Sequence, residues 1–265
     1  MELKSKSAID LMGLMNSSIE SHSGKGRKTT TTHLDWILRS PTIRQRIFSS
    51  RGNHLLVADF ASGENASVPI FFLSCISPQL RPRPVVYCID SHELRLEGLT
   101  SRLMEEGILD GFRTVHAKLE SMSKSARITG PPAVTGSDRP ASWNALDTHI
   151  EAHLSIPAGV FDVGIMNNDV IGFLSEYYCM HDGVMECLRE IQRVMADSST
   201  LIVTQPGLLY PLDNVSLLRA AGFIILEAVE VAPRHGSVSI YRDPSELPLR
   251  HHKDEYRFLV LSPGP

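Results

Sequence analysis

The sequence lacks the features that would place the protein in a membrane or outside the cell. No run of apolar residues approaches the roughly 18 that a membrane-spanning helix needs. The first residues, Met1 to Lys6, lack the apolar core of a signal peptide. We therefore expect a soluble, cytoplasmic protein with no membrane partner.

Cysteine is scarce, and its spacing is not that of a metal site. The 265 residues include four cysteines and no C-x-x-C pair. Cys88 lies in a predicted buried strand and Cys75 at the end of a predicted helix, which is typical of reduced thiols inside the cell. The histidines around His251 have no paired Asp or Cys ligands at the spacing of a zinc site. We predict no bound metal.

The charge is nearly balanced, with a net charge of −4 at neutral pH. This value argues against a broad nucleic-acid-binding surface. The basic segment from Lys25 to Lys28 lacks the leading glycine of a phosphate-binding loop, and no strand precedes it. We interpret this segment as a flexible linker, so nucleic acid is not an expected partner.

The most informative pattern runs from His54 to Asn65. An aliphatic run ends at Asp59 and is followed by the small residues Ala61 to Gly63. This order is typical of a central parallel strand in an α/β sheet, where ligands bind beyond the carboxyl ends of the strands. With 42% apolar residues, the chain is long enough to form one large domain of this class.

Residues 59–65 resemble the glycine-rich first motif of the class I S-adenosylmethionine-dependent methyltransferases. That motif is usually acidic-x-Gly-x-Gly-x-Gly, and Ala61 and Asn65 stand where two of its glycines are usual. Alanine is a mild change, and Asn adopts a positive φ more readily than other non-glycine residues. We therefore expect Asn65 to be tolerated in the conformation of the glycine that it replaces.

A second buried strand, Val85 to Ile89, is followed by Asp90. A carboxylate at this position can accept two hydrogen bonds from ribose hydroxyls. A dinucleotide-binding oxidoreductase has the same pair of features. These residues alone therefore do not distinguish a protein that binds NAD from one that binds S-adenosylmethionine.

Residues 161–169 resemble the fourth motif of the same methyltransferases, in which a Phe-Asp opening leads into a buried strand that ends beside the methyl group. The polar groups of Asn167, Asn168 and Asp169 are expected either to orient a nucleophile or to hold the amino-acid portion of the cofactor, with Asn167 beside the sulfonium. For Asp169, a role in capping the next helix is an equal alternative. The stretch is not Asn-Pro-Pro-Tyr, which argues against an enzyme directed at adenine or glutamine.

The cofactor that this resemblance implies is S-adenosyl-L-methionine. Its amino-acid portion is expected at the first motif, its ribose at Asp90 and its adenine near Ala117 and Lys118. The family often has Asp where Ala117 stands, so we expect the adenine contact from the backbone. The predicted cofactor-binding residues are Asp59, Phe60, Ala61, Ser62, Gly63, Asp90, Ser91, Ala117, Lys118 and Asn167.

Methyl transfer requires alignment of donor and acceptor and the exclusion of water, without a covalent nucleophile or a metal. If the acceptor must lose a proton, a histidine titrates in a suitable range. His181, after the fourth strand, is the first candidate and His33 the second, and for each a solvated or capping role is the alternative. The predicted catalytic residues are His181, Asn168, Asp169 and His33.

The order of the predicted elements indicates an α/β fold with a doubly wound, mostly parallel sheet of seven strands. The segments Phe223 to Val231 and Tyr256 to Ser262 have no clear crossover helix between them, so the last strand should be antiparallel. This reversed strand separates the methyltransferase sheet from the plain dinucleotide-binding fold.

We divide the chain into an N-terminal helical cap, residues 1–50, and a cofactor-binding domain, residues 51–265. Within this domain, residues 121–142 are rich in Ser, Gly and Pro and are predicted to form a mobile insertion. A helix from Trp143 to Leu154 should follow. The helix near His33 either lies across the crevice as a lid or packs on the far face of the sheet.

The predicted function is the methylation of a small molecule on oxygen or nitrogen, in secondary metabolism, by in-line transfer to that acceptor. An RNA methyltransferase is an alternative, motivated by the basic segment from Lys25 to Lys28. A non-catalytic methyltransferase-like partner subunit is another, motivated by the departures at Ala61, Asn65 and Ala117. The sequence is also compatible with a homodimer.

Overall fold

The computed structural model describes residues 33–49, 54–77, 83–129, 153–168, 170–178, 181–206, 211–232, 236–247 and 256–264. All of these residues belong to one compact unit, His33–Pro265. Residues 1–32 of the predicted cap lie outside the described residues, and so does the basic segment from Lys25 to Lys28.

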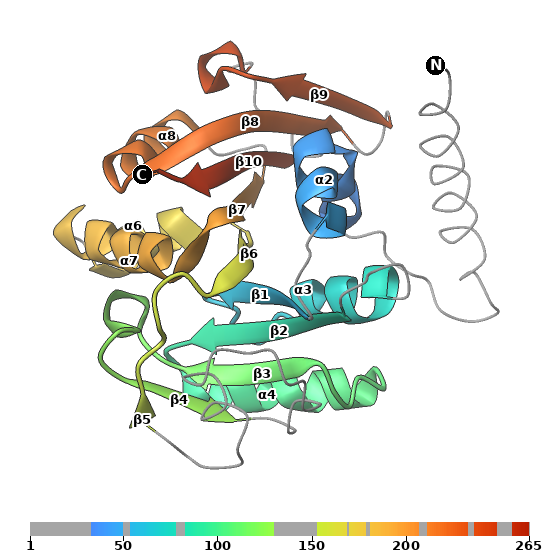
Figure 1. Ribbon diagram of the computed structural model, residues 1–265, viewed down its shortest axis with the longest axis vertical. Coiled ribbons are helices and arrows are strands. Elements are labelled where there is room, and N and C mark those ends of the chain that lie inside the picture. Colours follow the sequence, from blue (N-terminus) through green and yellow to red (C-terminus); the bar gives the residue numbers. More distant parts are fainter. Residues whose placement is uncertain are drawn as a thin grey trace. The chain divides into compact units, whose positions relative to one another are not determined.

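A single sheet of ten strands runs through this unit, in the order β5-β4-β3-β2-β1-β6-β7-β10-β8-β9 (Figure 1). The strands are β1 (His54–Phe60), β2 (Arg83–Asp90), β3 (Phe112–His116), β4 (Ala126–Thr129), β5 (His153–Leu154), β6 (Phe161–Met166), β7 (Met195–Pro206), β8 (Phe223–Ala232), β9 (Ser237–Tyr241) and β10 (Tyr256–Pro263). Neighbours from β3 to β7 pair in parallel, whereas β10 is antiparallel to both β7 and β8. The predicted fold class, including its reversed last strand, is confirmed.

Three strands were not expected from the sequence, and each lies near an edge of the sheet. β4 and β5 extend one edge and β9 the other, all in antiparallel pairing. β4 lies inside the segment predicted as a mobile insertion, and β5 occupies the end of the predicted helix. The pairing with β3 explains β4, because the hydroxyls of Thr114 and Thr129 hydrogen-bond at 2.7 Å. Residues 130–142 lie outside the described residues.

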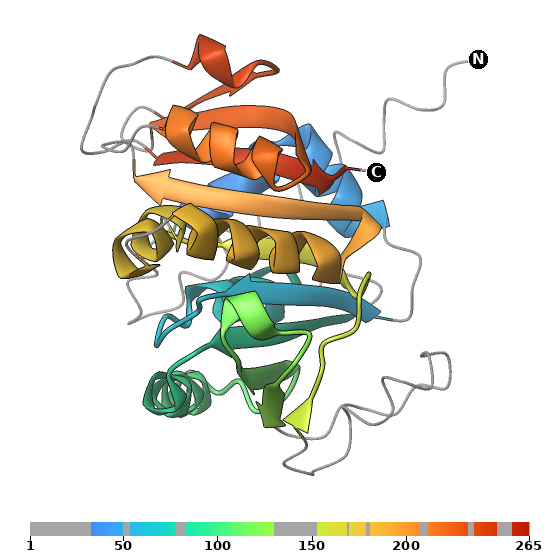
Figure 2. The ribbon, with the colours of Figure 1, turned by 90° about the vertical axis from the view of Figure 1, so that its left-hand side faces the viewer.

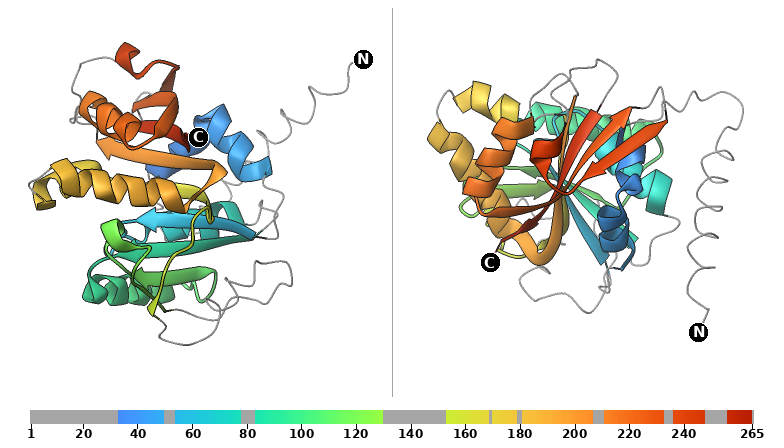
Figure 3. Two further views of the ribbon diagram at one scale, coloured as in Figure 1. Left: turned by 60° about the vertical axis from the view of Figure 1, so that its left-hand side comes forward. Right: turned by 90° about the horizontal axis from the view of Figure 1, so that it is seen from above.

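The helices connect the strands and cover the sheet on both faces. They are η1 (His33–Arg39), α2 (Pro41–Ser49), α3 (Ser67–Ile70), η2 (Phe71–Ile76), α4 (Glu93–Glu105), η4 (Leu119–Ser121), α6 (Val170–Tyr178), α7 (His181–Val194), α8 (Pro211–Ala220) and η6 (Pro244–Glu246). α6, α7 and α8 lie on one face, with α2 and α3 on the other (Figures 1 and 3). Within the described residues, every helix falls short of the length and apolar content that a membrane span requires.

The core on the α7 side of the sheet is aromatic and aliphatic. Phe161 packs edge-on against Phe60 and Tyr87, at centroid distances of 6.2 and 5.5 Å. α7 crosses in front of the strands in Figure 2 and buries its apolar stripe against them. A Cβ on Gly164 of β6 would lie 2.8 Å from the Met195 sulfur, so a larger residue there would force the neighbouring side chains to shift. This close packing fixes β6 beside β1.

The carboxylate of Glu227 in β8 links the N-terminal helices to the sheet. Ser40 caps α2 by accepting the N–H of Ile43 at 3.1 Å, and its hydroxyl donates to Glu227 of β8 at 2.5 Å. Thr42 donates to the same carboxylate. The two hydroxyl donors thus stabilise the negative charge of Glu227, which α2 partly covers.

The apolar residues of these helices are buried as well. Leu34 and Ile37 of η1 and Ile43 of α2 are fully covered, and Arg46 of α2 donates to the carbonyl of Ser198 in β7 at 2.7 Å. This placement favours the second of the two alternatives, in which the helices pack on a face of the sheet. The lid hypothesis loses its structural support.

Removal of residues 1–40 should therefore destabilise the sheet, because Leu34, Ile37 and Ser40 are lost together. Burial of each large aliphatic side chain contributes about 1.5–3 kcal/mol, so we expect a loss of about 3 kcal/mol or more and a lower melting temperature by circular dichroism. A chain lacking only residues 1–32 keeps all three side chains and serves as the control. Equal melting temperatures for the two truncated chains would contradict this assignment.

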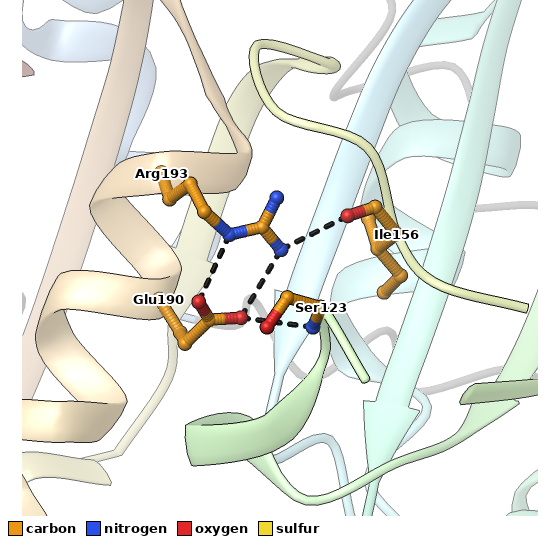
Figure 4. Close-up of polar contacts among 4 residues, drawn as sticks. All are labelled: Ser123, Ile156, Glu190 and Arg193. Carbon is orange, nitrogen blue, oxygen red and sulfur yellow. Dashed lines mark hydrogen bonds and ion pairs between the residues drawn. The ribbon is translucent and has the colours of Figure 1, made fainter. Parts of the chain in front are cut away.

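A polar cluster fixes α7 to the segments that flank β4 and β5 (Figure 4). Arg193 forms a two-pronged ion pair with Glu190, at 2.9 and 3.1 Å, and donates to the carbonyl of Ile156 at 2.9 Å. Glu190 also accepts the N–H of Ser123 at 2.9 Å. Burial raises the pKa of Glu190, but the hydrogen bonds from Arg193 and Ser123 outweigh it and leave the pKa below its ordinary value.

Replacement Glu190→Gln should reduce stability at neutral pH but not in acid. Because the folded-state pKa is lowered, the stabilisation is fully present above the unfolded-state pKa of about 4.3. It is lost as the pH falls from that value through the folded-state pKa. We expect a loss of about 1–2 kcal/mol at neutral pH in urea unfolding. Glu186→Gln, an exposed residue one turn earlier, is the control. A loss of stability in Glu190→Gln that is as large in acid as at neutral pH would refute this account.

Candidate cofactor-binding site

A cavity that is open to solvent lies beyond the carboxyl ends of β1, β2 and β3. The strand order reverses beside β1, since the chain leaves β3 at one side and returns in β6 at the other. Ligands of open α/β sheets bind at such a switch point. The lining residues are Ala61, Asp90, Ser91, His92, Arg95, Ala117, Lys118, Leu119, Phe173 and Leu174.

The wall of the cavity is organised by Asp90, at the end of β2. One carboxylate oxygen accepts the N–H of Gly63 at 2.9 Å, and the other accepts the N–H of His92 at 2.8 Å. The carbonyl of Asp90 accepts the N–H of Ala117 at 3.0 Å. The turns after β1 and β3 are therefore both tied to this residue.

The helix after Asp90, α4, begins at Glu93, and His92 occupies its N-cap position without a side-chain hydrogen bond. The hydrogen bond from the His92 N–H to Asp90 forms an Asx-turn that delays the helix. Ser91 is left exposed at the cavity wall.

The turn after β1 has left-handed backbone at two residues. Ala61 and Gly63 both have a φ of 56°. The expectation that Asn65 would need a positive φ is wrong. Its side-chain oxygen instead accepts the N–H of Ser67 at 2.9 Å, in an Asx-turn that precedes α3. Ala61 bears the strain, because a Cβ is disfavoured in this region.

The other residues of the first motif lie behind the cavity wall. Asp59 is buried, and burial followed by the charge of Asp90 raises the pKa of Asp59 well above its ordinary value. Phe60 packs on Phe161 in the core, so only its backbone is available to a ligand. The Ser62 hydroxyl is buried and has no hydrogen-bond partner in the described part of the chain.

The polar end of β6 is held by β7. The hydroxyl of Thr204 donates to the side-chain oxygen of Asn167 at 2.8 Å and accepts the N–H of Asn168 at 3.0 Å. Asn168 is exposed and adopts a φ of 63°, which Asn tolerates better than most residues. Thr204 thus fixes both the turn and the Asn167 amide.

Three predicted catalytic residues remain to be placed, Asp169, His33 and His181. Asp169 lies outside the described residues. His33 and His181 are the first residues of η1 and α7, and their side chains lie outside the described part. None of the described side chains of η1 lines the cavity. The general-base assignments stay predictions.

Five lining residues were missed by the sequence analysis: His92, Arg95, Leu119, Phe173 and Leu174. His92 and Arg95 follow a predicted ribose-binding carboxylate at the start of a helix, a position that signals proximity to the ligand. Phe173 is 48% exposed although it is aromatic. Its place in the cavity depends on the packing of α6 against α7, which local sequence does not reveal. Within the described residues, no cluster of three or more His, Cys, Asp or Glu side chains is arranged to hold a metal ion.

The fold is that of the class I S-adenosylmethionine-dependent methyltransferases. The sequence matches no protein-family model and no curated protein. Among solved structures, the [4+2]-cyclase SpnF is 13% identical, with a TM-score of 0.51, and the match covers 91% of this chain and 86% of that one. An S-adenosylmethionine-dependent methyltransferase from Clostridium acetobutylicum is 9% identical, with a TM-score of 0.48 and coverage of 87% and 90%. An rRNA methylase from Streptococcus thermophilus is 11% identical, with a TM-score of 0.45 and coverage of 91% and 100%.

Replacement Ala61→Gly should stabilise the protein, because glycine adopts a φ of 56° without the Cβ conflict. We expect a gain of about 1 kcal/mol in the free energy of unfolding, measured in urea. Ala66→Gly, after the same turn and without a positive φ, should instead be neutral or destabilising. A loss of stability in Ala61→Gly would show that the turn is not left-handed there.

Proposed function

We propose that the protein binds S-adenosyl-L-methionine in this cavity and transfers its methyl group to a small molecule. One observation carries the proposal: Ala61, Asp90 and Ala117, which come from three separate strand ends, line one cavity. The reversed β10 distinguishes the sheet from a plain dinucleotide-binding fold.

The cavity has groups suited to an adenosine. Each carboxylate oxygen of Asp90 accepts one backbone N–H and keeps a lone pair for a ribose hydroxyl. The backbone at Ala117 and Lys118 offers hydrogen bonds at the adenine end, and the ring of Phe173 offers an aromatic surface for the base. The bound group would supply an activated methyl on a sulfonium.

The first motif suits the amino-acid end of the same ligand. Gly63 and Ala61 present backbone in left-handed conformation, without large side chains. Asp59 lies beneath them with a raised pKa, caused by burial and by Asp90. A cationic ammonium nearby would favour the ionised form of Asp59, and the two charges would then stabilise each other.

The residues at the end of β6 are suited to aligning the acceptor. In-line transfer depends on orientation more than on acid–base chemistry. Thr204 holds the Asn167 side chain and the Asn168 backbone in fixed positions. We assign these residues to positioning, with His181 as the candidate base.

A small-molecule acceptor is supported by charge. The net charge of −4 argues against a broad surface for nucleic acid. A screen of small phenols, carboxylic acids and amines with methyl-labelled cofactor tests this class. Transfer to RNA but to none of these acceptors would overturn it.

Calorimetry with S-adenosylhomocysteine and, separately, with NAD tests the cofactor. We expect binding of the first and not of the second. Phe173→Ala should weaken S-adenosylhomocysteine binding by about 1–3 kcal/mol, because base stacking on an aromatic ring is lost, whereas Phe173→Tyr should keep it. Leu109→Ala, an exposed apolar residue outside the cavity, is the control. If S-adenosylhomocysteine does not bind at millimolar concentration, a non-catalytic subunit is favoured. If NAD alone binds, an oxidoreductase is favoured.

A further inference from the structure

The turn after β1 is hydrogen-bonded to two separate elements. The N–H of Asn65 donates to the carbonyl of Ser62 at 3.1 Å, which places Gly63 and Glu64 at the centre of a four-residue turn. The N–H of Gly63 donates to Asp90 at the end of β2, at 2.9 Å. Glu64 accepts two hydrogen bonds from Arg102 of α4. This part of the first motif is therefore held between β2 and α4.

Arg102 contacts Glu64 at two different groups. One guanidinium nitrogen donates to the main-chain carbonyl of Glu64 at 3.2 Å, and another donates to its carboxylate at 3.1 Å. The planar guanidinium presents several donors in a fixed arrangement and can make both contacts at once. The contact to the carbonyl restrains the path of the main chain. Arg102 therefore fixes the conformation of the turn as well as pairing with the charge of Glu64.

The helix α4 is a firm base for this contact. Its 13 residues are anchored by a buried apolar face made of Leu96, Leu99 and Leu103. Gly98 lies four residues before Arg102 and so shares its face of the helix. A Cβ on Gly98 would lie 3.3 Å from two side-chain carbons of Glu64. The small residue at this position lets the Glu64 side chain lie close against α4.

The turn needs external support because its conformation is costly. Ala61 and Gly63 both have a φ of 56°, in a region that residues with a Cβ disfavour. A glycine also loses more conformational entropy than other residues when it is fixed. A turn that is already ordered loses less entropy when a ligand binds, so the ligand binds more tightly. This gain applies to the part of the ligand that contacts the turn.

We propose that Arg102 is a positioning residue for the amino-acid portion of the cofactor, although it does not line the cavity. It acts through Glu64, by holding the turn in the conformation that receives this portion. The inference rests on the proposed function, which places the amino-acid end of S-adenosyl-L-methionine at this turn. In that orientation the adenosine lies at Asp90, Ala117 and Phe173, and its binding does not depend on Arg102.

Two ligands separate the ends of the cofactor in calorimetry on the full-length protein. S-Adenosylhomocysteine contains the amino-acid portion, whereas 5′-methylthioadenosine has the same adenosine and a thioether without it. Arg102→Gln should weaken the binding of S-adenosylhomocysteine about 3- to 10-fold, because hydrogen bonds from an exposed charged group are lost. The binding of 5′-methylthioadenosine should stay unchanged.

Two further variants locate the effect. Glu64→Gln removes the ion pair but keeps the main-chain acceptor of Arg102, so it should weaken S-adenosylhomocysteine binding less than Arg102→Gln does. Arg83→Gln is the matched control, because Arg83 forms an ion pair of similar length and exposure with Asp110, at the amino end of β2. It should leave the binding of both ligands unchanged. The melting temperatures of all three variants should stay close to that of the wild type, because exposed ion pairs contribute little to stability.

An equal loss of affinity for both ligands in Arg102→Gln, or a loss accompanied by a lower melting temperature, would show a merely structural role and overturn the inference. Unchanged binding of S-adenosylhomocysteine in Arg102→Gln would overturn it as well, and would leave the proposed function intact. Failure of the wild-type protein to bind S-adenosylhomocysteine would overturn both proposals. The two failures are therefore distinguishable.

Discussion

The hydrogen bonds of Asp90 determine the geometry of the cavity. Parallel pairing brings the ends of β1, β2 and β3 to one edge of the sheet, but it does not determine how the turns beyond them are arranged. The Asp90 carboxylate does so, by accepting N–H groups from Gly63 and His92. Because a buried carboxylate needs such donors, the turns and the charge stabilise one another. The start of α4, the left-handed turn after β1 and the floor of the cavity all follow from this residue.

A second consequence is that the cavity is electrostatically uneven. Asp59 and Asp90 lie close together beneath the turn after β1, and their proximity contributes to the raised pKa of Asp59. Arg95 and Lys118 are exposed residues of the same cavity lining as Asp90. The lining therefore combines the buried carboxylate of Asp90 with exposed cationic side chains.

The sequence alone predicted the parts of the fold that depend on continuous apolar runs. β1, β2, β6 and β10 have strong aliphatic patterns, and the reversed β10 followed from the lack of a crossover helix. β4 and β9 were missed, because short strands rich in Ser, Thr and charged residues are stabilised by their neighbours and not by their own pattern.

The site was predicted unevenly for a similar reason. Asp90 and Ala61 follow strands, so their positions were implied by the strand pattern. Arg95 and Phe173 reach the cavity from helices whose placement depends on tertiary packing, and no local signal identifies them. Asn65 was assigned a backbone conformation by analogy with glycine, whereas its side chain forms an Asx-turn with the backbone N–H of Ser67.

The attachment of α2 to β8 has a consequence for the order of folding. Ser40 and Glu227 are 187 positions apart along the chain. During synthesis from the N-terminus, Ile43 and Ile47 emerge long before the strands that cover them. Their apolar side chains therefore stay exposed until most of the chain has been synthesised. A contact of this span is slow to form, because loop closure must precede it. The nascent protein is thus most prone to aggregation before β8 and β10 complete the sheet, because α2 is already present and its apolar side chains are not yet covered.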